Sequence, residues 1–101
     1  NFLFQQDNWK ELGDVHEFSQ NTGYEIFRTF LYEPAQYSLL NLAQNERIEI
    51  LEWYFKNLSL TQILNGSRVL RPLLDSLEPI DKFYFYQKYH ALIFSEKGEV
   101  A

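Results

Sequence analysis

Two histidines are the side chains whose type and surroundings suit metal binding or acid–base catalysis. His16 lies between Asp14 and Glu17, and metal centres commonly combine imidazole nitrogens with carboxylate oxygens. On a helix, Asp14 and Glu17 share one face whereas His16 points to another, so a metal would need a further ligand from a distant segment. We therefore expect a solvated acidic helix surface here, and no metal site.

His90 follows a run of aromatic residues, which is typical of a histidine within a core or at its boundary. The hydroxyl-nucleophile motifs G-x-S-x-G and S-x-x-K are absent, there is no cysteine, and the four glycines are isolated rather than clustered in a phosphate-binding loop. The sequence thus predicts no catalytic residue and no cofactor. A small enzyme that uses His16 or His90 with nearby acids is the third functional hypothesis.

Charge is unevenly distributed along the chain. The net charge is −5, and residues 1–52 contain nine acidic side chains against three basic ones. An acidic chain as a whole does not attract the phosphates of a nucleic acid. The asymmetry predicts a basic partner protein for the first half, and its candidate contacts are Glu46, Glu49 and Glu52.

Aromatic residues are concentrated near the C-terminus. The run over residues 83–89 contains Tyr84, Tyr86 and Tyr89. Tyrosine is a common anchor in protein interfaces, because it buries a large ring and keeps a polar hydroxyl. We therefore predict these three tyrosines as partner-binding residues. The alternatives are a core element whose hydroxyls reach the surface and a platform that stacks on nucleic-acid bases.

Periodic apolar residues indicate the helices that would position these side chains. Helical spacing predicts a helix over 42–57 and a short helical turn over 59–64. A further helix is expected to begin near Pro72, since proline is tolerated in a first helical turn, and to end at Pro79.

Polar residues at capping spacing indicate where helices begin. Asn8 with Glu11 predicts a helix over 9–19, and Asn41 with Gln44 forms a second cap-like pair. Asp81 is a candidate cap for a final element that begins at residue 82.

Two segments fit a helix and a strand equally well. Residues 24–33 show apolar spacing of both kinds, and residues 82–94 are almost continuously apolar, so periodicity cannot decide. We expect a mainly α fold, a compact bundle of about four to five short helices, with a C-terminal β-hairpin over 82–94 as an alternative. Residues 1–101 are expected to form a single domain. The missing initiator methionine indicates processing or excision from a longer chain.

Residues 45–51, 58–64 and 67–77 form three consecutive helical patterns. In this order they resemble the first, second and recognition helices of a bacterial winged helix-turn-helix domain. The resemblance implies a wing hairpin over 82–99 and DNA binding in the major groove. The DNA contacts that it implies are Ser67, Arg68 and Arg71. DNA-binding regulation is accordingly the second functional hypothesis.

The leading hypothesis is a non-enzymatic protein-binding module, such as a regulatory subunit, an inhibitor or an immunity-type protein. The chain is small and acidic, lacks a catalytic motif, and contains two Trp and seven Tyr, residue types that are enriched in interfaces. We expect another protein as partner, with a homodimer through an apolar helix face as a further option. No apolar stretch approaches the roughly 18–20 residues of a membrane span. The absence of cysteine and of a signal peptide favours the cytoplasm.

Overall fold

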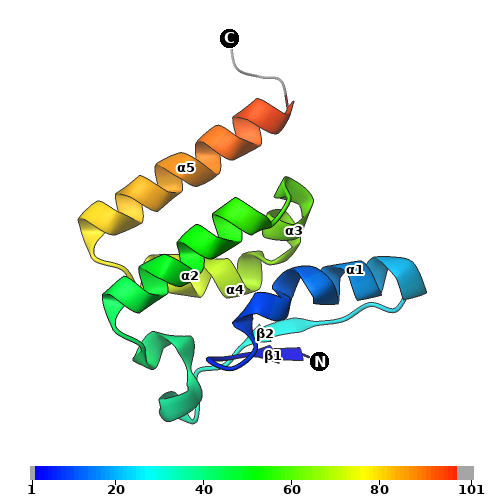
Figure 1. Cartoon of the computed structure of the whole chain (residues 1–101), viewed down its shortest axis with the longest axis horizontal. Helices are drawn as coiled ribbons and strands as arrows, with labels where there is room; N and C mark the ends of the chain where they lie inside the picture. Colours follow the sequence, from blue (N-terminus) through cyan, green and yellow to red (C-terminus); the bar gives the residue numbers. More distant parts are fainter. Residues whose placement is uncertain (1, 98–101) are drawn as a thin grey trace.

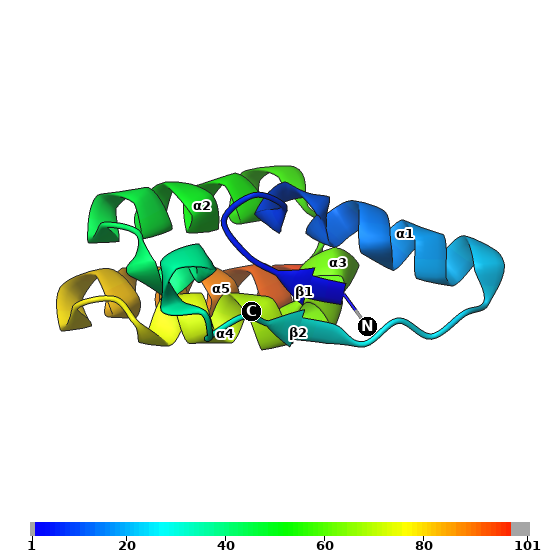
Figure 2. The same cartoon turned by 90° about the horizontal axis from the view of Figure 1, so that it is seen from below.

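The computed structural model describes the backbone of residues 2–97 and the side chains of residues 2–91. Five α-helices dominate it, which confirms the mainly helical prediction (Figure 1). The α-helices are α1 (Leu12–Thr22), α2 (Gln44–Asn57), α3 (Leu60–Asn65), α4 (Ser67–Asp75) and α5 (Pro79–Lys97). The short elements are the strands β1 (Phe2–Phe4) and β2 (Arg28–Phe30) and the 3-10 helices η1 (Trp9–Glu11), η2 (Ala35–Tyr37) and η3 (Leu39–Asn41). Seen edge-on, α1 and α2 lie on one side, with α4, α5 and the strands on the other (Figure 2).

The two strands pair in parallel, although they lie far apart in the sequence. Phe2 is opposite Arg28, and Phe4 is opposite Phe30. The Phe4 carbonyl accepts a hydrogen bond of 3.1 Å from the N–H of Leu31, just beyond β2. Phe4 and Phe30 are both buried. The ambiguous segment 24–33 therefore contains a strand, which is short and is stabilised by a distant partner.

The alternative of a C-terminal β-hairpin over 82–94 is wrong, because this whole segment belongs to the helix α5. Its apolar side chains lie on more than one side of the helix. Phe85 is 1% exposed, whereas Ile80 and Phe83 are 85% and 64% exposed. A helix that is apolar all round carries no helical hydrophobic period, so its sequence pattern cannot be separated from that of a strand.

The winged-helix resemblance is corrected in two respects. The segment expected to form the wing, 82–99, is helical through Lys97, and residues 98 and 99 lie outside the described residues. The two helices that the resemblance assigns to the helix-turn-helix unit exist as α3 and α4, but Gly66 alone separates them. The turn of a helix-turn-helix unit is typically 3–4 residues long.

The helix expected to begin near Pro72 begins five residues earlier, so α4 contains this proline. Proline has no N–H, and it therefore leaves the carbonyl of Arg68 without its helical donor. Burial compensates for this loss, because Leu70, Leu73 and Leu74 on the same helix are all buried. The short helix over 59–64 is confirmed as α3.

The predicted capping role of Asn8 is wrong. Its side-chain oxygen accepts a hydrogen bond from the Gln5 N–H at 2.8 Å, and its side-chain nitrogen donates to the Leu3 carbonyl at 2.9 Å. Asn8 thus closes the turn after β1. The chain then passes through η1 directly into α1, which ends at Thr22 and is followed by Gly23 in a left-handed conformation with φ of 75°.

The pair Asn41 and Gln44 does not cap α2, because Asn41 lies in η3 and Ala43 precedes the helix. Instead, the Glu46 carboxylate accepts a hydrogen bond from the Ala43 N–H at 3.4 Å. The Gln44 side chain donates to the carboxylate of Asp81 at 2.9 Å. Asp81, which was expected to cap the final element, therefore links the start of α5 to the start of α2.

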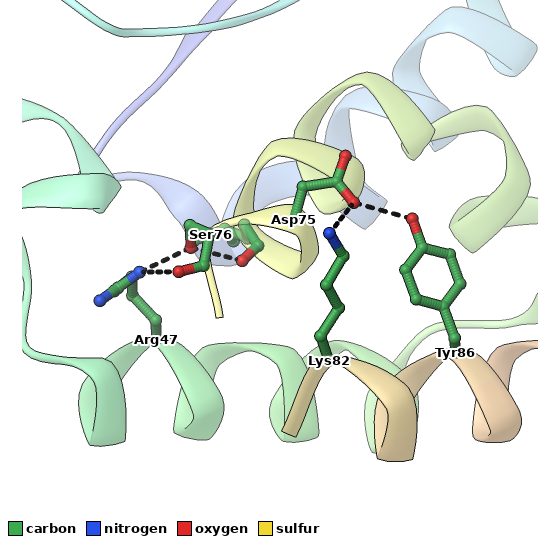
Figure 3. Close-up of polar contacts among 6 residues, drawn as sticks. Arg47, Asp75, Ser76, Lys82 and Tyr86 are labelled. Carbon is green, nitrogen blue, oxygen red and sulfur yellow. Dashed lines mark hydrogen bonds and ion pairs between the residues drawn. The ribbon is translucent and has the colours of Figure 1, made fainter. Parts of the chain in front are cut away.

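One cluster of buried apolar side chains joins the helices to the strands. Its largest fully buried members are Tyr54, Phe4 and Phe85. A polar contact supports it: Arg47 Nη1 on α2 donates to the carbonyl and hydroxyl oxygens of Ser76 at 3.0 and 2.6 Å (Figure 3). The cluster and this contact fix α2 against the end of α4. No helix within residues 2–97 is long and apolar enough to cross a membrane.

Candidate functional site

A hollow of about 440 Å³ lies between the N-terminal segment and α2. We name it the tryptophan hollow, because both tryptophans of the chain, Trp9 and Trp53, line it. Its other lining residues are Gln6, Lys10, Leu42, Glu46, Glu49 and Ile50. Four of these eight residues are apolar and four are polar or charged, so the hollow can offer a ligand both apolar and polar contacts.

Aromatic contacts hold Trp9 against α2. Its ring meets the ring of Trp53 edge to face, with centroids 5.4 Å apart and planes at 87°, and it contacts Tyr54 in the same way at 5.6 Å. The buried Tyr54 hydroxyl donates to the Trp9 carbonyl oxygen at 2.5 Å. Burial raises the pKa of Tyr54 far above its ordinary value, so the hydroxyl remains a donor throughout the neutral range.

The tryptophan hollow already contains a cation from its own chain. Lys10 Nζ lies 5.4 Å from the centroid of the Trp9 ring and 5.8 Å from that of Trp53. Both distances allow a cation–π interaction. Glu46 and Glu49, three positions apart on α2, line the same hollow and add negative charge. The arrangement suits a positively charged side chain.

The structure separates the three acidic residues that the sequence analysis grouped. Glu46 and Glu49 line the tryptophan hollow, whereas Glu52 lines a different hollow beside Lys56 and Lys88. All three carboxylates are exposed on α2. Glu52 therefore provides a matched control for the charge of the other two.

The three predicted tyrosines do not form one surface. Tyr84 is 51% exposed. Tyr86 and Tyr89 are half-buried: the Tyr86 hydroxyl donates to an Asp75 carboxylate oxygen at 2.8 Å (Figure 3), and the Tyr89 ring packs edge-on against Phe55. The hydrogen bond to Asp75 raises the pKa of Tyr86. Tyr84 thus faces solvent, while the other two pack against α4 and α2.

A second hollow, of about 450 Å³, lies between β2 and α4. The residues to which the winged-helix resemblance assigns DNA contacts, Ser67, Arg68 and Arg71, all line it. Arg28 of β2, which the sequence analysis missed, joins them. The remaining lining residues are Thr29, Phe30, Tyr32 and Pro72, and none is acidic. We name this hollow the arginine groove.

The histidines do not belong to a metal-binding cluster within the described residues. Asp14 and Glu17 are exposed, as expected of a solvated helix surface, whereas His16 is buried and its Nδ1 has no hydrogen-bond partner there. His90 is exposed rather than at a core, with the rings of two tyrosines nearby. No three His, Cys, Asp or Glu side chains in the described part of the chain are placed to hold a metal ion.

Trp9, Trp53 and Lys10 were not predicted from the sequence as members of one site. The available signals were the rarity of tryptophan and the adjacency of Trp9 and Lys10. Neither signal shows that η1 packs on the middle of α2, and that contact is what brings the two rings together.

No family model matches the chain, and no curated protein or solved structure is significantly similar to it. Function therefore has to be inferred from the tryptophan hollow and the arginine groove.

Proposed function

We propose that this chain is a non-enzymatic protein-binding module whose tryptophan hollow takes a lysine or arginine side chain of a basic partner protein. The observation that carries the proposal is the meeting of two indole rings and two carboxylates at one hollow. Tryptophan is the strongest cation–π acceptor among the side chains and is enriched among the residues that dominate binding energy.

The hollow offers a cationic side chain two kinds of contact. Its aliphatic stem would pack on the rings and on Leu42 and Ile50, which lie among the lining residues. Its charged head would lie near Glu46 and Glu49. Each cation–π contact contributes about 0.5–2 kcal/mol, depending on how far the site is desolvated. A single anchor of this kind would therefore give the partner only a modest affinity for the hollow, and contacts around the hollow would have to supply the rest.

Lys10 makes the proposal specific. It lies over the same two rings that a partner cation would use, so the two cations compete. Replacing Lys10 by glutamine should strengthen binding of a basic partner, because the competitor and its repulsion are removed. If the hollow instead bound an anion through Lys10, the same replacement would abolish binding of that anion.

Isothermal titration of the chain with a short Gly/Ser peptide that carries central Lys-Arg residues tests the proposal. Glu46→Gln and Glu49→Gln should each weaken binding about two- to fivefold, in line with the loss of roughly 0.4–1 kcal/mol of charge attraction in an exposed pair. Glu52→Gln is the matched control and should leave binding unchanged. Lys10→Gln should strengthen it a few fold.

Two outcomes contradict the proposal. Equal weakening by Glu52→Gln and Glu49→Gln would show that the peptide follows net charge and not the hollow. Loss of binding in Lys10→Gln would show that the hollow is an anion site.

Several finer features belong to this proposal. Whether the module acts as a regulatory subunit, an inhibitor or an immunity-type protein depends on its partner. Self-association through the exposed side of α5, where Ile80 and Phe83 lie, is a further option. A reducing compartment such as the cytoplasm is proposed because the chain has no cysteine.

DNA binding is the second candidate function. The gathering of Ser67, Arg68 and Arg71 at one groove favours it, whereas the net charge of −5 opposes it.

A further inference from the structure

We infer that the arginine groove is a second docking site, independent of the tryptophan hollow, which takes an extended acidic segment of a partner protein as an added strand beside β2. Addition of a peptide strand to a sheet edge is a common mode of peptide recognition, in which backbone hydrogen bonds supply affinity and side-chain contacts supply specificity. Three features of β2 and α4 support the inference.

The first feature is an unpaired strand edge. The Phe27 carbonyl accepts from the Phe2 N–H at 2.9 Å, and the Leu31 N–H donates to the Phe4 carbonyl, so the odd-numbered positions of this segment face β1. Backbone groups alternate in direction along a parallel strand. The N–H and C=O groups of Arg28 and Phe30 therefore point away from β1. Within the described residues, the sheet has no strand on that side.

The second feature is that the arginine groove lies beside β2, where this strand meets α4. Phe30 is buried on the face of β2 that packs on the core, whereas Thr29 is exposed on the opposite face. Both residues line the hollow together with residues of α4, and no residue of β1 lines it, so the hollow lies where β2 meets α4 and not where β2 meets β1. Figure 2 shows β1 on one side of β2, which leaves the other side as the margin of the pair.

The third feature is a concentration of positive charge, although one of its arginines, Arg71, also lies near the Tyr86 hydroxyl. Arg28 Nη1 donates to the Ile26 carbonyl at 3.2 Å, while its buried Nε has no partner within the described residues. Arg68 and Arg71 are exposed and, three positions apart, share a face of α4. None of the three arginines forms an ion pair with a described carboxylate. Glu25 lines an adjoining hollow and not the groove.

An acidic peptide matches all three features, whereas a nucleic acid matches only the last. A nucleic acid would bring phosphates to the arginines but no backbone N–H groups for the strand edge, and it would approach a chain of net charge −5. In an added strand, every second side chain lies on the same face, about 6.6–6.8 Å apart. Acidic residues at alternate positions would therefore be directed toward the side on which α4 carries Arg68 and Arg71.

The test is amide hydrogen exchange followed by NMR, with an eight-residue peptide of alternating Glu and Val as the probe. On saturation, exchange of the Arg28 and Phe30 amide protons should slow at least tenfold. Exchange of the Thr29 and Leu31 amides should change little, because they already face β1. The same peptide with its inter-strand amides N-methylated should bind at least tenfold more weakly.

Charge variants test the arginines separately. The double variant Arg68→Glu/Arg71→Glu should weaken peptide binding at least tenfold. The matched control is the double variant Lys56→Glu/Lys88→Glu, which makes the same change in net charge at exposed positions outside the groove and should have little effect. Glu49→Gln should leave binding of the acidic peptide intact, because Glu49 lines the tryptophan hollow and not the arginine groove. This variant therefore separates the test of the arginine groove from the test of the tryptophan hollow. Three results would overturn the inference: no peptide binding at low salt, equal binding of the N-methylated peptide, or tighter binding of an oligothymidylate of equal charge.

Discussion

Removal of the Tyr54 hydroxyl tests how the tryptophan hollow is held together. Tyr54→Phe keeps the buried ring and its edge contact with Trp9 at 5.6 Å, and it deletes only the hydrogen bond to the Trp9 carbonyl. A net hydrogen bond contributes about 0.5–1.5 kcal/mol, and leaving a buried acceptor without a partner costs about 1–3 kcal/mol. Because Trp9 is only half-buried, water can partly satisfy its carbonyl. We therefore expect a loss of about 1.5 kcal/mol in the free energy of unfolding.

Urea unfolding followed by tryptophan fluorescence measures this loss, since both tryptophans of the chain lie in the hollow. With an m-value of about 1–3 kcal/mol/M for a small domain, the midpoint should fall by roughly 0.5–1.5 M. Loosening of Trp9 should also weaken binding of the Lys-Arg peptide.

Tyr84→Phe is the matched control, because Tyr84 is half-exposed on α5 and does not line the hollow. Its midpoint should be unchanged. If Tyr54→Phe were as stable as the wild-type chain, the Tyr54–Trp9 hydrogen bond would not be what fixes η1 on α2, and the reasoning would fail.

Two further predictions concern the scaffold. Gly66→Ala should destabilise the fold by about 2 kcal/mol through overpacking, because a Cβ there would lie 2.6 Å from Leu12 Cδ2. Gly23→Ala should destabilise the fold by only about 1 kcal/mol, because a Cβ there meets open space and the cost is the strain of a φ of 75°. A lower melting temperature for Gly23→Ala than for Gly66→Ala would contradict the packing at Gly66. Asp75→Asn should lower the pKa of Tyr86 toward its ordinary value of 10.0. The hydrogen bond from Tyr86 stabilises the fold below pH 10.0 and is lost as the pH rises through the raised pKa. If the Tyr86 ring of Asp75→Asn titrated by NMR at the same pH as the ring of the wild-type chain, this prediction would be refuted.

The helices could be predicted from the sequence where one face of the helix meets the core. In α2, Ile50, Leu51 and Tyr54 are buried while charged residues face solvent, and that contrast produces a clear helical period. In α5, Ile80 and Phe83 are exposed although they are apolar, so the period is absent. The strands could not be predicted because each has three residues and owes its conformation to its distant partner.

The candidate sites were predictable only in part, for a related reason. Glu46 and Glu49 line one hollow on a helix that was predicted, whereas Glu52, which was grouped with them, lines another. Tyr84 and Tyr86 would share a face of a strand, but on a helix they lie about 200° apart around its axis. Arg28 reaches the arginine groove only through the pairing of β2 with β1 and the packing of β2 on α4, and neither contact leaves a local pattern in the sequence.

The most direct test of the central claim is an NMR titration that observes the indole N–H groups of Trp9 and Trp53. The ligand is the Lys-Arg peptide, and its control replaces both cations by norleucine, which keeps an apolar stem without charge. We predict that the cationic peptide shifts both indole signals saturably and that the norleucine peptide shifts them at least tenfold less at equal concentration. Binding of the cationic peptide with both indole signals unmoved would place its site elsewhere and contradict the proposed function.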